Sequence, residues 1–133
     1  MKGVLKARGL VDGLGWGEVL ISQSPISFLE GMDSESGKII DESHELFGLS
    51  VSKRVLIFPY SVGSSVGAYI IYKLKKKDNA PSAIINLKSD LTTVSGCALA
   101  NIPLVDQVKG LELVQEKDEL IVNGGKGFVI LYS

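Results

Sequence analysis

The middle of the chain alternates short apolar runs with amphipathic segments. Residues 55–58 (VLIF) form an uninterrupted apolar run ended by Pro59, and residues 83–87 (AIINL) form a second run. Such runs are typical of strands buried on both faces. Between them, apolar residues from Val66 to Leu74 recur at three- and four-residue spacing, which predicts a helix of about three turns. Lysines gather at its end, where the helix dipole favours cations.

The alternation continues toward the C-terminus. Residues 91–100 predict a short helix rich in small side chains, and residues 103–105 predict a third buried strand. Strand, helix, strand, helix and strand in this order indicate a parallel sheet with crossover helices.

The two ends of the chain follow a different pattern. Residues 2–8 and 17–21 read as short strands separated by a glycine-punctuated loop at 9–15. Residues 24–48 lack periodicity and predict a long loop, which in a compact domain usually binds or covers something.

The last third of the chain predicts antiparallel strands. Residues 111–114 and 119–122 alternate or half-alternate, and an Asn-Gly turn at 123–124 leads into the apolar run at 127–132. Asn-Gly between two such runs is a strong hairpin signal. We therefore expect one α/β domain over residues 1–133, with a central, partly parallel sheet, crossover helices and antiparallel strands from both termini.

Composition narrows the class of protein. Fourteen basic and fifteen acidic residues give a net charge of −1, which gives no reason to expect nucleic acid or an acidic membrane as partner. Cys97 is the only cysteine, so an internal disulfide is excluded, and an iron–sulfur cluster usually needs three or four thiolates. The sequence has no signal-peptide core and no run of about 18 apolar residues, so we expect a soluble cytoplasmic protein.

The segment between the first buried strand and the helix after it is the candidate site. A strand, a Gly/Ser loop and a helix in succession direct free backbone N–H groups toward an anion. Gly63 permits a positive φ, and Ser64 or Ser65 can cap the helix. The same residues also fit an ordinary capped turn, and the loop lacks both the P-loop pattern and GxSxG.

Other polar residues have simpler interpretations. His44, between carboxylates, could be a metal ligand, but a loop that is exposed or ordered at an interface is favoured. Asp33 and Asp41 flank the turn at 34–37 and can stabilise it through side-chain-to-backbone bonds, or can contribute to a substrate site or an interface. Asn86 follows a buried strand at the carboxyl edge of the sheet, where such folds bind ligands, so it is a candidate to line a cleft. Cys97 is expected to be a buried packing residue.

A set of segments spread along the chain resembles the small subunit of the aconitase X family over essentially the full length. These segments are residues 17–20 (GEVL), 25–28 (PISF), 31–33 (GMD), 37–41 (GKIID), 55–69, 83–87 (AIINL) and 102–106 (IPLVD). The resemblance implies a swivelling β/β/α domain that closes over a larger catalytic body. It also implies a hydro-lyase subunit that is active only with a large subunit, as a heterodimer.

Within this family, the resemblance points to dehydration of mevalonate 5-phosphate to trans-anhydromevalonate 5-phosphate in the archaeal mevalonate pathway. It identifies Ser64 as the general base. Gly63 and Ser65 beside it, together with Asn86 at the carboxyl edge of the sheet, are the candidates for substrate or oxyanion binding. It implies no cofactor or metal in this chain and an iron–sulfur cluster on the large subunit. The loop departs from the family pattern, because Tyr60, Ser61 and Val62 replace a basic-Gly-basic triplet.

Two alternatives remain open at this point. The chain can be the small subunit of another aconitase X-type dehydratase, acting for example on a hydroxyproline, and the missing loop cations keep this possibility open. It can also be a non-catalytic module whose Gly/Ser loop binds an anion without reacting.

Overall fold

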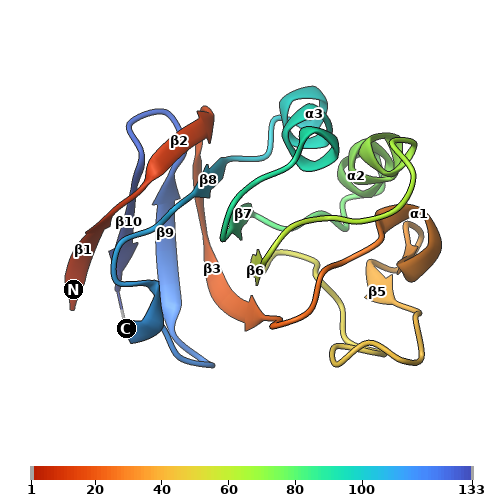
Figure 1. Ribbon diagram of the computed structural model, residues 1–133, viewed down its shortest axis with the longest axis horizontal. Helices are drawn as coiled ribbons and strands as arrows, with labels where there is room; N and C mark the ends of the chain where they lie inside the picture. The colour runs from red at the N-terminus through yellow and green to blue at the C-terminus, as the bar shows by residue number, and fades with distance from the viewer. Residues whose placement is uncertain (1, 133) are drawn as a thin grey trace.

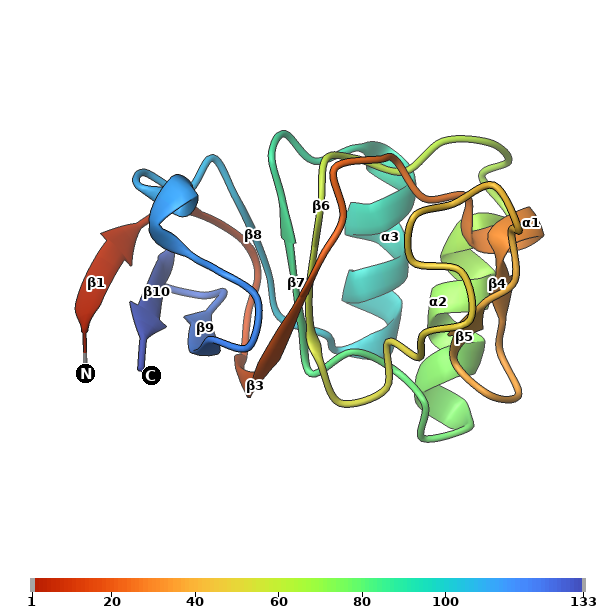
Figure 2. The same cartoon turned by 90° about the horizontal axis from the view of Figure 1, so that it is seen from below.

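Three layers make up the fold in the computed structural model, which describes residues 2–132 (Figures 1 and 2). Antiparallel strands form one outer layer, parallel strands form the middle, and helices cover the far side. The strands of the main sheet are β1 (Gly3–Lys6), β2 (Arg8–Val11), β3 (Leu14–Ile21), β6 (Val55–Phe58), β7 (Ala83–Asn86), β8 (Leu104–Asp106), β9 (Glu119–Asn123) and β10 (Phe128–Leu131). Their order is β1-β10-β9-β3-β6-β7-β8-β2.

The middle layer confirms the predicted parallel sheet. β6 pairs in parallel with β7, and β7 pairs in parallel with β8. The crossovers are α2 (Gly67–Lys76) and α3 (Leu91–Ala100), which pack side by side on one face of the sheet (Figure 1). Both helices fall where the apolar periodicity places them.

β3 connects the two sheet layers. Its first half, at 14–18, pairs antiparallel with β9, and its second half, at 19–21, pairs in parallel with β6. The predicted C-terminal hairpin is confirmed as β9 and β10, and β1 pairs antiparallel with β10. The antiparallel layer therefore combines both ends of the chain.

Two hydrophobic cores explain why the middle strands are continuously apolar. Alternate residues of β6, such as Leu56 and Phe58, face the helices and pack with Ile71 and Leu74 of α2. Residues between them, such as Val55, face the antiparallel layer. Because both faces of each strand are covered, polar residues are excluded from most positions.

Three sequence-based expectations about the ends are wrong in detail. Residues 2–8 form two strands rather than one, with a break at Ala7 between β1 and β2. The predicted loop at 9–15 lies largely in β2 and β3. Residues 111–114 form no strand, because a 3₁₀ turn, η1 (Leu111–Leu113), follows Gly110 in a left-handed conformation with φ of 88°.

The long 24–48 segment contains more structure than expected, although it has no long element. It holds the short helix α1 (Phe28–Gly31) and a small hairpin of β4 (Met32–Asp33) and β5 (Lys38–Ile39). No helix within residues 2–132 is both long and apolar enough to cross a bilayer.

Candidate functional site

The loop at 59–66 joins β6 to α2 at the carboxyl edge of the parallel strands. Gly63, Ser64 and Ser65 are all exposed to solvent. The loop begins beside the next strand, because the Leu87 N–H donates to the Pro59 carbonyl over 3.1 Å. The predicted strand–loop–helix arrangement is therefore present, with its Gly/Ser turn on the surface.

Ser64 begins the turn that leads into α2. Its hydroxyl accepts a hydrogen bond from the Val66 N–H at 3.1 Å, and its carbonyl accepts one from the Gly67 N–H at 2.9 Å. The expectation that Ser64 or Ser65 caps the helix is not met, because α2 begins after Val66 and no side chain caps it; the Ser64 hydroxyl instead closes the turn that precedes the helix. Gly63 precedes it with a φ of 91°, in the left-handed region that favours glycine.

The turn presents unpaired donors to solvent. Within the described part of the chain, no group accepts a hydrogen bond from the backbone N–H of Gly63, Ser64 or Ser65. They lie at the positive end of α2, on the same turn as the Ser64 hydroxyl. The turn can therefore stabilise negative charge on a bound group or on the serine oxygen itself.

Ser61 is held from the opposite side by Asp90, which begins α3. The Ser61 N–H donates to Asp90 Oδ1 at 2.7 Å, and the Ser61 hydroxyl donates to Asp90 Oδ2. Thr93 donates to the same carboxylate from its N–H (2.9 Å) and its hydroxyl (3.0 Å). Burial alone would raise the pKa of Asp90, but these hydrogen bonds lower it below its usual value.

Asn86 lies at the predicted edge but does not face a cleft. Its side chain is fully buried; Nδ2 donates to the Phe58 carbonyl at 3.1 Å, and Oδ1 accepts from the Ser89 hydroxyl at 2.7 Å. These bonds tie the ends of β6 and β7 together beneath the Gly/Ser loop. Asn86 is therefore not placed to contact a ligand directly. Its side chain stabilises the edge of the sheet under the loop.

The 24–48 segment uses its polar residues internally. Asp33 accepts from the Glu35 N–H and the Ser36 hydroxyl, so its predicted role in the turn at 34–37 is confirmed. Asp41 accepts from the Ser43 N–H and hydroxyl instead, so it stabilises the following turn and not the predicted one.

His44 accepts from the Leu46 N–H at Nδ1, and its Nε2 lies 3.1 Å from the Pro25 carbonyl. These two contacts select the Nε2–H tautomer and hold the ring within the loop.

The chain does not carry the ligand set of an iron–sulfur cluster. Cys97 lies on α3 and is fully buried in the core, and burial raises the pKa of its thiol. Over residues 2–132, no three His, Cys, Asp or Glu side chains are grouped so that they could hold a metal ion. These residues therefore do not fit the thiolate ligation that an iron–sulfur cluster requires.

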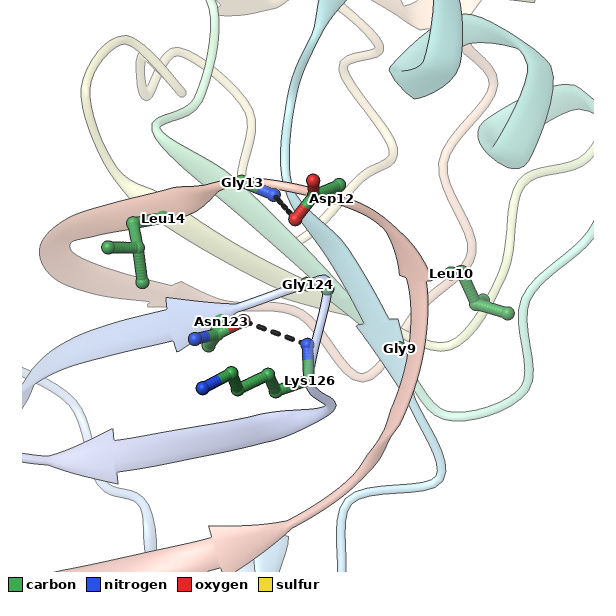
Figure 3. A pocket seen from close by; sticks show the side chains of 9 residues that line it. Gly9, Leu10, Asp12, Gly13, Leu14, Asn123, Gly124 and Lys126 are labelled. Atoms are coloured by element: carbon green, nitrogen blue, oxygen red, sulfur yellow. Dashed lines mark hydrogen bonds between the residues drawn. The ribbon is translucent and has the colours of Figure 1, made fainter.

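Two hollows lie apart from the exposed turn. One, of about 520 Å³, is at the same edge of the sheet and is lined in part by Gln23, Gln107 and Glu112. The other, of about 800 Å³, lies at the opposite end of β3, between that strand and the β9–β10 turn (Figure 3). There Asp12 bonds the Gly13 N–H and Asn123 bonds the Lys126 N–H, so these side chains fix local turns.

The Ser61–Asp90 pair is the part of the site that sequence reasoning missed. The two residues are 29 positions apart, and their contact depends on neighbouring parallel strands ending at one edge. A usable signal existed, because an aspartate directly before a predicted helix is a typical cap.

Comparisons with known proteins identify the family of this chain. The model of the aconitase X swivel domain matches residues 4–131. The phosphomevalonate dehydratase small subunit of Methanosarcina mazei is 42% identical over 128 residues, which is 95% of this chain and 89% of that protein. The protein of the same name from Archaeoglobus fulgidus is 42% identical over 126 residues, covering 93% and 95%.

A solved structure gives the same result for the fold. The crystal structure of Thermococcus kodakaraensis aconitase X in its holo-form superposes with a TM-score of 0.93 at 36% identity, covering 98% of this chain and 99% of the matched one. The three-layer β/β/α architecture inferred from the resemblance is thereby confirmed. The chain belongs to the aconitase X swivel domain family.

Proposed function

We propose that this chain is the small subunit of a phosphomevalonate dehydratase and that Ser64 is its general base. The exposed Ser64 hydroxyl, placed at the start of α2 beside unpaired backbone N–H groups, is the observation that carries the proposal. The archaeal relatives that bear this name support the choice of substrate. The reaction would dehydrate mevalonate 5-phosphate to trans-anhydromevalonate 5-phosphate.

A serine hydroxyl is a poor base at neutral pH, so its surroundings must favour the alkoxide. The Val66 N–H already donates to Ser64 Oγ, and the positive end of α2 adds to this field. Such donors act far more strongly where water is excluded. Ser64 would then take a proton from the carbon next to the one that carries the leaving hydroxyl.

The elimination also needs a group that assists departure of the hydroxyl. No metal-binding group of side chains exists within residues 2–132, so we assign this task to a large subunit that carries the iron–sulfur cluster. The name small subunit, borne by the relatives, implies such a partner.

The surface around Ser64 supports closure by a second chain. Five apolar side chains near the turn are 45–81% exposed: Tyr60, Val62, Val66, Leu87 and Leu91. Apolar groups that surround a polar centre are suited to exclude water once they are covered. We therefore place the heterodimer contact across this rim, so that the active site forms between the two chains.

A second candidate rests on the composition of the loop. Tyr60 and Val62 stand where relatives usually carry cations, and both are exposed. This surface offers no charge-assisted contact to a phosphate from those two positions. A related dehydratase that acts on an unphosphorylated hydroxy acid, such as a hydroxyproline, is therefore the alternative.

The test is to co-express the chain with its large subunit, purify the complex without oxygen, and follow product formation from mevalonate 5-phosphate by mass spectrometry. Ser64→Ala should lower kcat by about 10²–10⁴-fold, the usual contribution of a general base. Ser43→Ala, which removes an exposed hydroxyl that bonds Asp41, is the matched control and should keep wild-type turnover. Full turnover in Ser64→Ala would overturn the assignment of the base, and activity on hydroxyproline alone would overturn the substrate.

A further inference from the structure

The Asp90 side chain connects the Gly/Ser loop to the second crossover helix. Each of its carboxylate oxygens accepts two hydrogen bonds, one from Ser61 and one from Thr93. Thr93 belongs to α3, whereas Ser61 lies three residues before Ser64. A single carboxylate therefore caps α3 and holds the loop that presents the proposed base.

We infer that Asp90 is a positioning residue for Ser64, which it orients by fixing Ser61 against the start of α3. The inference rests on the proposed function of Ser64, and the Ser61–Asp90 contact itself is a feature of the described chain. Asp90 does not touch the reacting atoms in this account; it acts through the loop.

The other side of the loop is fixed by backbone, which makes Ser61 the point where its path is set. The Ile26 N–H donates to the Tyr60 carbonyl at 3.3 Å, and the Val62 N–H donates to the Ile26 carbonyl at 3.0 Å. Ser61 is thus clamped between the strand-like segment at residue 26 and the Asp90 carboxylate. Only Val62 and Gly63 separate it from Ser64, so a shift of Ser61 displaces the hydroxyl directly.

Electrostatics explain why a carboxylate can stand here without repelling an anionic substrate. All four donors point at Asp90, and two of them are backbone N–H groups at a loop and a helix start. Hydrogen bonds of this number neutralise much of the local field of the charge. An asparagine could not replace it, because its Nδ2 would face the donors that now meet Asp90 Oδ2.

The experiment uses the two-subunit enzyme and compares two variants, each of which removes one hydroxyl that donates a hydrogen bond to the Asp90 carboxylate. Ser61→Ala removes the hydroxyl bond on the loop side, and Thr93→Val removes the hydroxyl bond on the helix side while keeping the side-chain shape; the backbone N–H bonds of both residues to Asp90 remain. We expect Ser61→Ala to lower kcat about tenfold or more and Asp90→Asn to lower it by about 10²-fold, the scale of a small misplacement of a reacting group. Thr93→Val should lower kcat less than twofold, and Ser61→Thr, which keeps the hydroxyl, should restore turnover.

A second readout separates positioning from folding and from the proposed chemistry. In the full chain alone, amide hydrogen exchange of Ser61, Val62 and Val66, whose N–H groups are hydrogen-bonded to Asp90, to the Ile26 carbonyl and to Ser64 Oγ, should quicken in Ser61→Ala and stay unchanged in Thr93→Val, with thermal unfolding recorded for both. Equal losses of kcat in Ser61→Ala and Thr93→Val would indicate that Asp90 acts only as the cap of α3, which would overturn the inference. Wild-type kcat in Asp90→Asn would also overturn it. If Ser64→Ala keeps full turnover, the proposed base fails instead, whatever the exchange data show.

Discussion

Replacing Gly63 by alanine should strain the turn that presents Ser64 while removing no hydrogen-bonding group. A left-handed backbone costs a residue with a Cβ about 1–2 kcal/mol, and Gly63 has a φ of 91°. The new Cβ would also lie 3.0 Å from Ser27 Oγ, so Ser27 must turn away. Because this hydroxyl caps α1 through a long 3.4 Å bond from the Glu30 N–H, its loss adds roughly 0.5–1 kcal/mol.

The expected total is a loss of about 1.5–3 kcal/mol in the free energy of unfolding. With an unfolding entropy of about 2.1 cal/mol/K per residue, this corresponds to a fall in Tm of roughly 5–10 °C for a chain of this length. The alanine can relieve its strain only by moving the loop, so kcat of the two-subunit enzyme should fall by about 10–100-fold.

Gly48 offers a matched control for the backbone strain. Its φ is 83°, close to that of Gly63, yet a Cβ added there meets nothing within 4 Å. Gly48→Ala should therefore cost about 1–2 kcal/mol of stability and leave kcat unchanged.

The assay combines thermal unfolding of each purified variant with steady-state turnover of the reconstituted enzyme. The reasoning is refuted if Gly63→Ala keeps wild-type kcat, or if Gly48→Ala loses as much activity as Gly63→Ala.

Three further predictions concern the core. Burial alone would raise the pKa of Asp106, but hydrogen bonds, first of all those from Arg8, lower it below its usual value. The ionised Asp106 therefore stabilises the fold fully above the pKa of an unfolded aspartate, and this contribution is lost as the pH falls through the lower pKa of the folded state. Asp106→Asn should thus cost about 1.5–3 kcal/mol in urea at pH 7 and less at acid pH; an equal cost at both would contradict this. Cys97, whose thiol pKa burial raises, should react with a thiol reagent only as fast as the chain unfolds, and rapid labelling of the native chain would count against its burial. Gly96→Val would bring a Cβ within 2.6 Å of Ile71 Cδ1 and should destabilise the α2–α3 contact by about 1–3 kcal/mol in thermal unfolding, whereas an unchanged Tm would show that the helices can separate freely.

The parallel half of the fold was predictable because its signals are local. Residues 55–100 carry apolar runs of strand length and helical spacing that need no knowledge of their partners. The 9–15 segment was not predictable in this way. A Cβ on Gly9 would lie 2.3 Å from the Gly124 carbonyl oxygen, and one on Gly15 would lie 2.1 Å from that of Ser82. These glycines lie in strands where another backbone passes closely, and sequence alone cannot distinguish that need from a turn.

The same distinction between local signals and contacts with distant segments applies to the candidate site. Gly63 and Ser64 occupy the turn that their own neighbours in sequence indicate, although the helix begins only after Val66 and has no side-chain cap. Asn86 was assigned to the correct edge, but the direction of its side chain depends on the Phe58 carbonyl and on Ser89. The bond between Ser61 and Asp90 depends on two crossovers that begin side by side after β6 and β7, which is a property of the topology rather than of either segment.

The geometry of Ser64 argues that this chain alone should be catalytically silent. The serine is exposed, and the one protein donor to its hydroxyl among residues 2–132 is the Val66 N–H. In water, such a donor and a helix terminus shift the acidity of a hydroxyl only slightly, because solvent screens their field. The apolar rim can become a water-excluding wall only when a second chain covers it. Asp90 on one side and residue 26 on the other hold the turn in this subunit, so if Ser64 is the base as proposed, its strength should depend on closure.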